Sequence, residues 1–144
     1  MIHEDTIKLL AECEKGIDMG IDSIDTVMGS VTSDRMREHL KRSKDEHTRL
    51  KEEISWMLRE YQGEAAEANP IIKGMSYIKT KMSLMMNSSD HKIAGLMIDG
   101  CNMGIKSLSR FLNEYAAASE RSKDITKKLI ALEDSLAGKM REYL

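Results

Sequence analysis

The sequence predicts an all-α protein, a four-helix bundle with an additional crossover helix. Apolar residues recur every three or four positions through most of the 144-residue chain, which is typical of helices that bury one face. A nine-residue stretch near the N-terminus returns 84 residues later, and such a repeat indicates a duplicated structural unit. A shorter apolar segment lies between the two copies. We therefore expect two related helical hairpins joined by a crossover helix.

The repeated stretch is 16–24, and its second copy is 100–108, with five of nine positions identical. Two glycines stand four residues apart in each copy, at Gly16 and Gly20 and at Gly100 and Gly104. Glycine inside a helix costs about 1 kcal/mol relative to alanine, but this spacing leaves a bare strip that another backbone can approach. We expect the two strips to face each other across a pseudo-two-fold axis. The alternative is that they relieve crowding around methionine or aromatic side chains.

The first hairpin, residues 3–62, is predicted from two apolar seams separated by a polar turn. Its helices span about 3–29 and about 34–62. Thr32 or Ser33 is expected to cap the second helix, because a hydroxyl there accepts a hydrogen bond from a free N–H group of the first turn. The unit is an antiparallel pair of long helices.

The crossover helix is predicted over residues 70–86. Asn69 and Pro70 are typical of an N-cap and a first helical position. At 1.5 Å per residue this helix is about 25 Å long, too short to match its neighbours but suited to carry the chain back along the bundle. Lysines opposite its methionines leave a second interpretation open, in which the segment lies on a membrane or clasps a partner helix.

The second hairpin is predicted over residues 90–143, with helices at about 90–118 and 120–143. Its last residues, Arg141-Glu142-Tyr143, match Arg59-Glu60-Tyr61 at a shift of 82, which favours a hairpin as the duplicated unit over a chance match. If a two-fold axis relates the hairpins, the first and third core helices are antiparallel and the second and third parallel. Parallel successive helices need a long crossover.

Composition excludes several classes of protein. Hydrophobic residues make up 41% and charged residues 32% of the chain, which is typical of one globular domain, residues 1–144. No run of 18 apolar residues is present, and the first residues lack the basic and apolar regions of a signal peptide. A net charge of −2 with mixed signs argues against nucleic acid as a partner. Two cysteines without metal-site spacing fit a reducing cytoplasm.

Glu14 and His47 are the ionisable residues on the predicted seams of the first two helices. Counted in residues from the first turn, they lie at a similar position along the bundle axis. Because charged side chains are rarely buried unpaired, we expect these two to face each other. A histidine beside a carboxylate could hold iron, manganese or zinc in a mononuclear or half-formed site. The alternatives are a hydrogen-bonded pair that fixes packing, or a rotated helix that exposes one of them. Their counterparts in the second hairpin are Ile98 and Leu129, so a symmetric two-metal site is not predicted.

Other candidate residues are predicted to be structural. Asp99 and Glu133 flank the seams of the last two helices, where either could add a metal ligand but both are expected to be boundary charges. Cys13 and Cys101 lie well inside helices and are expected to be small buried residues rather than reactive thiols. The twelve methionines indicate an adaptable core or interface, with copper binding as the alternative.

The helix layout, the crossover and the doubled Gly-x-x-Met-Gly motif resemble the ferritin-like superfamily, and in particular small bacterial ferritin-like proteins. The resemblance covers nearly the whole chain and implies the ferritin-like fold. Di-iron members take a Glu from each of two helices and Glu-x-x-His from each of the other two. Here Lys44 stands three residues before His47, and the fourth predicted helix has no histidine. The resemblance therefore implies the fold without the oxidase or iron-storage site.

The sequence favours a cytoplasmic, non-enzymatic structural or protein-interaction module that self-associates as a homo-oligomer, a dimer. No cofactor, nucleic acid or membrane contact is predicted. The second hypothesis is a metal-binding ferritin-like protein with a degenerate core site at Glu14 and His47. The third is peripheral membrane or spore-layer association through residues 70–86.

Overall fold

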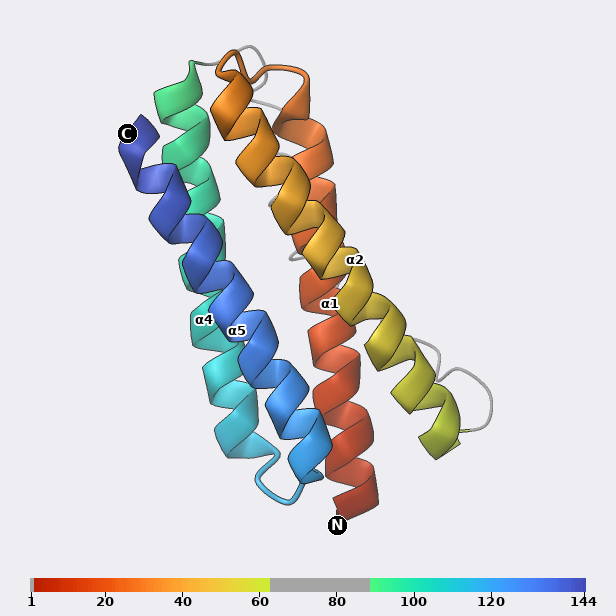
Figure 1. The fold of residues 1–144 in the computed structure, drawn as a ribbon. Helices are drawn as coiled ribbons and strands as arrows, with labels where there is room; N and C mark the ends of the chain where they lie inside the picture. The colour runs from red at the N-terminus through yellow and green to blue at the C-terminus, as the bar shows by residue number, and fades with distance from the viewer. Residues whose placement is uncertain (1, 63–88) are drawn as a thin grey trace.

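The computed structural model describes residues 2–62 and 89–144, which form four long helices and a short C-terminal 3-10 helix (Figure 1). The elements are α1 (Ile2–Met28), α2 (Asp34–Gln62), α4 (Asp90–Glu114), α5 (Glu120–Met140) and η1 (Arg141–Tyr143). The predicted all-α four-helix bundle is confirmed for these residues. The predicted linker and crossover helix, residues 63–86, lie outside them.

The two hairpins are antiparallel pairs, and the chain enters the second hairpin at the end opposite to the one where it leaves the first (Figure 1). At one end of the bundle, a ring nitrogen of His3 lies 3.1 Å from the carbonyl oxygen of Tyr61. At the other end, the Asp90 carboxylate accepts hydrogen bonds from the backbone N–H groups of Thr32 and Ser33, each at 2.9 Å. Helices α2 and α4 therefore run in the same direction, as the topology argument from the repeat expects. The pseudo-two-fold axis itself stays a prediction.

Side chains set the ends of the helices. Ser33 caps α2, because its hydroxyl accepts a hydrogen bond from the Met36 N–H at 3.2 Å. Helix α4 ends at Glu114, four residues earlier than predicted, where Tyr115 leaves the helical backbone conformation. The turn that follows is held by α1, since Thr6 accepts from the Ser119 N–H at 2.8 Å. This contact holds the turn between α4 and α5 against α1.

The buried apolar residues form two clusters, one toward each end of the bundle. One cluster includes Ile24, Leu40 and Met97, and the other includes Ile17, Ile54 and Leu129. Between them along α2 and α5 lie three buried polar residues, Ser43, His47 and Glu133.

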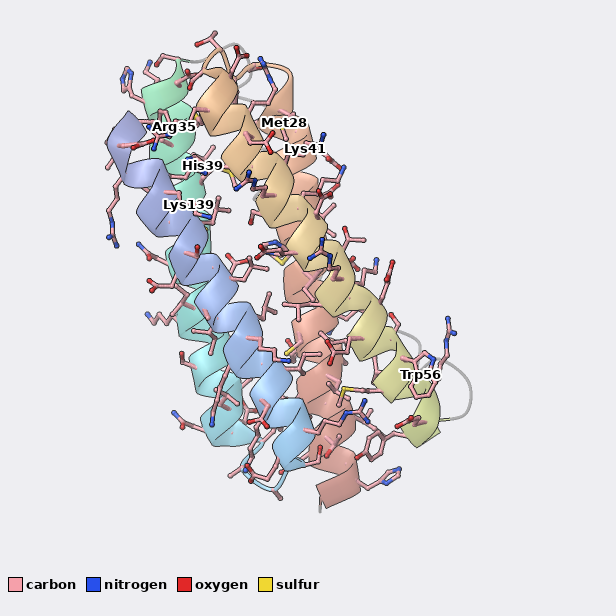
Figure 2. The ribbon with its side chains drawn as sticks, in the orientation of Figure 1. Met28, Arg35, His39, Lys41, Trp56 and Lys139 are labelled. Atoms are coloured by element: carbon pink, nitrogen blue, oxygen red, sulfur yellow. The ribbon has the colours of Figure 1, made fainter. Side chains whose placement is uncertain are left out.

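The outer surface of the described helices is polar, with few large apolar exceptions. Figure 2 shows Trp56 pointing away from the bundle, and it is 60% exposed. None of the described helices is both long and apolar enough to cross a membrane.

Candidate functional site

The middle of the bundle contains a buried pair of opposite charges, His47 from α2 and Glu133 from α5. The Nε2 atom of His47 lies 2.6 Å from Oε1 of Glu133. On the other side of the ring, Nδ1 lies 2.7 Å from the carbonyl oxygen of Ser43, to which it donates. His47 is fully buried, and Glu133 is 8% exposed. The pair joins the second helix of one hairpin to the second helix of the other.

The environment of His47 favours its charged form. Burial lowers the pKa of the imidazole, because removing a charge from water is costly. The hydrogen bond to Glu133 and the negative charge of that carboxylate outweigh the burial, with a smaller contribution from the Ser43 carbonyl. The net result is a pKa of His47 above its ordinary value of 6.5. The protonated ring donates at both nitrogens, so its hydrogen-bonding capacity is used within the core.

Two of the four repeated glycines make room for this pair. A Cβ atom built on Gly20 would lie 3.0 Å from Nε2 of His47, and one on Gly104 would lie 3.6 Å from Oε2 of Glu133. Gly16 and Gly100 have no such neighbour within 4 Å in the part of the chain that the structure describes. The alternative interpretation, relief of crowding, therefore applies to Gly20 and Gly104. The crowding side chains are a histidine and a glutamate, not the methionine or aromatic residues that the sequence suggested.

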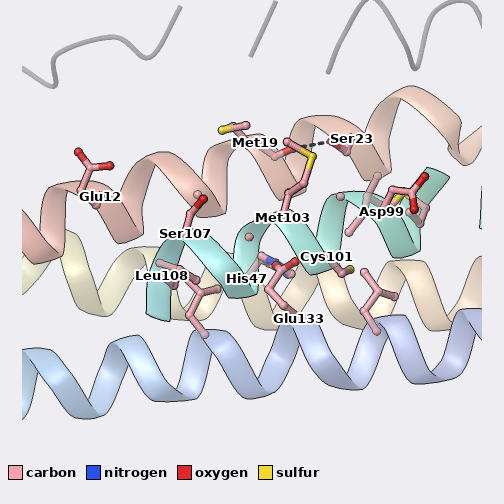
Figure 3. A pocket seen from close by; sticks show the side chains of 18 of the residues that line it. Glu12, Met19, Ser23, His47, Asp99, Cys101, Met103, Ser107, Leu108 and Glu133 are labelled. Atoms are coloured by element: carbon pink, nitrogen blue, oxygen red, sulfur yellow. Dashed lines mark hydrogen bonds and ion pairs between the residues drawn. The ribbon is translucent and has the colours of Figure 1, made fainter. Parts of the chain in front are cut away.

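All four glycines line one groove between α1 and α4, which encloses a pocket of about 370 Å³ (Figure 3). The lining is mainly apolar, and His47 and Glu133 lie at its floor. Along the groove, α1 contributes Glu12 and Met19, and α4 contributes Asp99 and Met103. Met103 is 53% exposed, although most methionines near it are buried or half-buried.

Glu14 does not face His47, so that prediction is wrong. Its Oε2 atom accepts a hydrogen bond from the Ser55 hydroxyl at 3.1 Å. The Lys51–Asp18 and Lys44–Asp25 ion pairs, each at 2.6 Å, follow the same antiparallel register.

The reason is the geometry of the first turn. In the observed register Glu14 lies beside Ser55, about 12 Å along α2 from His47. Counting from the turn assumed that both helices begin at the same height. The register instead puts the start of α2 about 10 Å beyond the end of α1. The residues between Met28 and Asp34 span that difference.

The sequence analysis also missed the role of Glu133, which it treated as a boundary charge. Glu133 stands four residues after Leu129 and three before Leu136, on the face that these buried leucines share. That spacing was a usable signal, because a lone buried histidine needs a partner. Asp99, the other expected boundary charge, is exposed at the edge of the groove.

Both cysteines are buried inside helices, as predicted. The Cys13 sulfur lies 3.2 Å from the Thr126 hydroxyl, and burial raises the pKa of Cys13 to about 11. The pKa of Cys101, which lines the groove, is also raised, by burial and by the charge of Glu133. Both groups are thus protonated thiols at neutral pH, whereas nucleophiles and metal ligands are thiolates.

The arrangement does not suit the metal site that the sequence left open. His47 would have to give up a hydrogen bond to Ser43 or Glu133 before a ring nitrogen could bind a metal. In residues 2–62 and 89–144, no group of three or more His, Cys, Asp or Glu side chains is placed to hold a metal ion. Glu14 lies too far along the bundle to contribute.

Comparison with known proteins gives no family assignment. No family model matches the chain, and no curated protein and no solved structure matches it either. The resemblance to the ferritin-like superfamily therefore stays a prediction, and the function has to be argued from the groove and the charged pair beneath it.

Proposed function

We propose that this protein is a non-catalytic structural or interaction module whose groove between α1 and α4 holds an apolar helix in the native protein. The observation that supports this most directly is the composition of the groove. Its walls are mainly apolar, its glycines lack side chains, and the charges at its floor bind each other. A surface of this kind is suited to packing against a helix face, not to reacting with a substrate.

The glycines give the groove a shape that a helix can use. Among residues 2–62 and 89–144, a Cβ atom built on Gly16 or Gly100 would meet nothing within 4 Å. A helix that lies in such a groove inserts side chains at positions i, i+3, i+4 and i+7, and the bare glycines allow its backbone to approach closely. The exposed Met103 at the edge adds a flexible apolar contact that adapts to its partner.

The polar groups at the floor support a non-catalytic role. A general base has to reach the proton that it removes, with an unoccupied acceptor atom. Both nitrogens of His47 are engaged by groups of the same chain, and Cys101 is a protonated thiol. The pair thus neutralises and orders the floor of the groove. Metal binding at Glu14 and His47 is not part of this proposal because about 12 Å separates them along α2.

The test is to fill the groove with a side chain and measure the free energy of unfolding in urea. Gly100→Leu adds an apolar side chain to the groove, and Gly138→Leu adds the same side chain to an exposed site on α5 with equal open space. Leucine is a better helix former than glycine, so either change should stabilise an isolated helix by about 1 kcal/mol. If a helix occupies the groove of the native protein, Gly100→Leu displaces it and destabilises the protein.

We expect the two changes to shift the free energy of unfolding in opposite directions. Gly138→Leu should raise it by up to about 1 kcal/mol, and Gly100→Leu should lower it by about 1 kcal/mol or more. Equal stabilisation by the two changes would mean that the groove is unoccupied in the native protein. That result would overturn the proposed function.

A further inference from the structure

The pair of His47 and Glu133 joins the two hairpins at the middle of the bundle, between the contacts that join them at its ends. At one end, Asp90 of α4 accepts hydrogen bonds from the turn before α2. At the other end, the Ser119 N–H group donates to Thr6 of α1 at 2.8 Å. Among residues 2–62 and 89–144, no other ion pair between the hairpins is buried. The middle of the interface between α2 and α5 therefore depends on the proton that the pair shares.

The carbonyl group of Ser43 fixes which nitrogen of His47 can lose a proton. A carbonyl oxygen only accepts hydrogen bonds, so Nδ1, at 2.7 Å from it, keeps its hydrogen. The proton that leaves for solvent is therefore the one on Nε2, which lies 2.6 Å from Oε1 of Glu133. Once this proton has left, a nitrogen lone pair and a carboxylate oxygen face each other. At so short a distance only a hydrogen between the two atoms makes their contact favourable.

The packing around the pair leaves little room for a local adjustment. A Cβ atom built on Gly20 of α1 would lie 3.0 Å from Nε2 of His47 and 3.7 Å from Oε1 of Glu133. Glu133 is only 8% exposed, and a buried carboxylate without a partner is costly. The thiol of Cys101, which lies near the pair (Figure 3), is a weak donor and cannot replace a charged imidazolium. The carboxylate reaches water if the middle of α2 moves away from α5.

The other groups around the ring of His47 do not supply a second positive charge inside the core. Helix α5 presents Glu133, α4 presents the neutral thiol of Cys101, and α1 presents Gly20. Glu46, the neighbour of the histidine on α2, adds a weak negative charge. Other charged residues near this level of the helices are partly or fully exposed: Asp18, Asp22, Asp25, Lys44, Asp45, Lys51 and Asp134.

We propose that the His47–Glu133 pair is a proton-operated latch between the two hairpins. With a proton on Nε2 of His47, the latch holds the middle of α2 against α5. When this proton passes to solvent, the Glu133 carboxylate turns toward water and the middle of α2 moves away from α5, while the contacts at both ends stay. The latch consists of groups from α2 and α5, so it operates with or without a helix in the groove.

Distances between spin labels, measured by pulsed electron paramagnetic resonance in the full-length protein, test the proposal. One pair of labels is attached at Thr48→Cys on α2 and Ser135→Cys on α5, two exposed positions beside the latch. A second pair, at Arg59→Cys and Asp124→Cys, reports on one end of the same two helices. Labelling below pH 6.5 keeps the latch closed and spares the native cysteines, which are buried protonated thiols. All variants carry His39→Gln, which removes another histidine that titrates on α2.

The distance between the labels at Thr48 and Ser135 should increase as pH rises through the folded pKa of His47, which lies above 6.5. We expect an increase of about 1 to 2 Å, a common size for a helix shift at an interface, and no change for the labels at the end. Glu133→Gln is the matched control, because its amide can donate to the neutral ring and accept from the protonated ring. In this variant neither distance should change with pH. His47→Gln, whose amide donates at every pH, serves as the second control.

Three results would overturn the proposal. The first is a constant distance between the labels at Thr48 and Ser135 while nitrogen NMR shows that Nε2 of His47 loses its proton. The second is a ring that keeps this proton until the whole protein unfolds. The third is an increase in distance that persists in Glu133→Gln or His47→Gln, which would assign the movement to other titrating groups.

Discussion

Both copies of the glycine motif leave space beside the helix backbone, but side chains of opposite charge fill that space in the two copies. In the first copy, Gly20 lies against the ring of His47: a Cβ atom built on Gly20 would lie 3.0 Å from Nε2 of that ring. In the second copy, Gly104 lies against the carboxylate of Glu133, at 3.6 Å. The backbone pattern was repeated, whereas the residues that meet it, one from α2 and one from α5, were not. The repeated glycines therefore leave room for packing, and the charged side chains that fill this room come from α2 and α5.

The comparison also explains why the charged pair lies where it does. His47 and Glu133 stand between two apolar clusters, where unpaired charges would be costly. His47 lies beside Gly20 of its own hairpin, whereas Glu133 lies beside both Gly104 of its own hairpin and Gly20 of the other, so the pair forms only when the two hairpins are correctly aligned. We infer that it selects one alignment of the hairpins, as buried polar groups do in some coiled coils. Its net contribution to stability is a separate question, because both charges lose their hydration.

Breaking the pair should have the largest effect. Glu133→Leu leaves the Nε2 atom of the fully buried His47 without its partner, which should reduce the free energy of unfolding by about 3 kcal/mol. The double change His47→Leu with Glu133→Leu removes both charges and should cost about 1 kcal/mol or less, since an apolar pair of similar volume can replace a buried ion pair. Urea unfolding of the two single variants and the double variant measures the coupling.

Additive losses would contradict this interpretation. If the double variant loses as much as the two single changes together, the two side chains act independently and do not form a pair. A double variant that is stable but populates several oligomeric or partly ordered forms would instead support the role in alignment.

The pH dependence of stability should be the next largest effect. Because the pKa of His47 is raised in the folded protein, its contribution is complete below the ordinary pKa of 6.5 and is lost as pH rises through the raised value. His39, near Arg35 and Lys139 (Figure 2), has a lowered pKa owing to burial and these cations, and its contribution has the opposite sign. The measurement is therefore made in a His39→Gln background.

In that background, stability should fall as pH rises through the folded pKa of His47, and the slope should vanish in the double variant His47→Leu with Glu133→Leu. A slope that persists in the double variant would assign the pH dependence to other groups. A slope of opposite sign would mean that the ring is neutral in the folded protein.

The helices could be predicted from the sequence because apolar spacing and turn residues are local signals. The start of α2 at Asp34 and its cap at Ser33 follow from such signals. The pairing of His47 could not be predicted in the same way. It depends on the register between α1 and α2, and the number of residues in the turn does not show how far that turn extends along the bundle axis. It also depends on the rotation of α5 about its own axis, which brings Glu133 inward. An error of about 10 Å in height was enough to assign His47 the wrong partner.

The smallest predicted effect tests the two glycines directly. In an open helical position, Gly→Ala should stabilise the protein by roughly 0.5 to 1 kcal/mol. At Gly104 the added methyl group makes ordinary contacts with Glu133, so Gly104→Ala should give most of this gain. At Gly20 it would press on the ring of His47, which Ser43 and Glu133 hold from both sides, so Gly20→Ala should be neutral or destabilising.

Gly138→Ala is the control for Gly20, at an exposed site on α5 outside the groove where the methyl group meets no described atom within 4 Å. Thermal and urea unfolding of the three variants should rank Gly138→Ala and Gly104→Ala above the parent and Gly20→Ala at or below it. Equal gains at all three positions would mean that the His47 ring can move aside, and hence that the pair is not held rigidly. Repeating Gly20→Ala in the His47→Leu and Glu133→Leu double variant separates the two explanations, since a flexible leucine should yield to the methyl group and restore the gain.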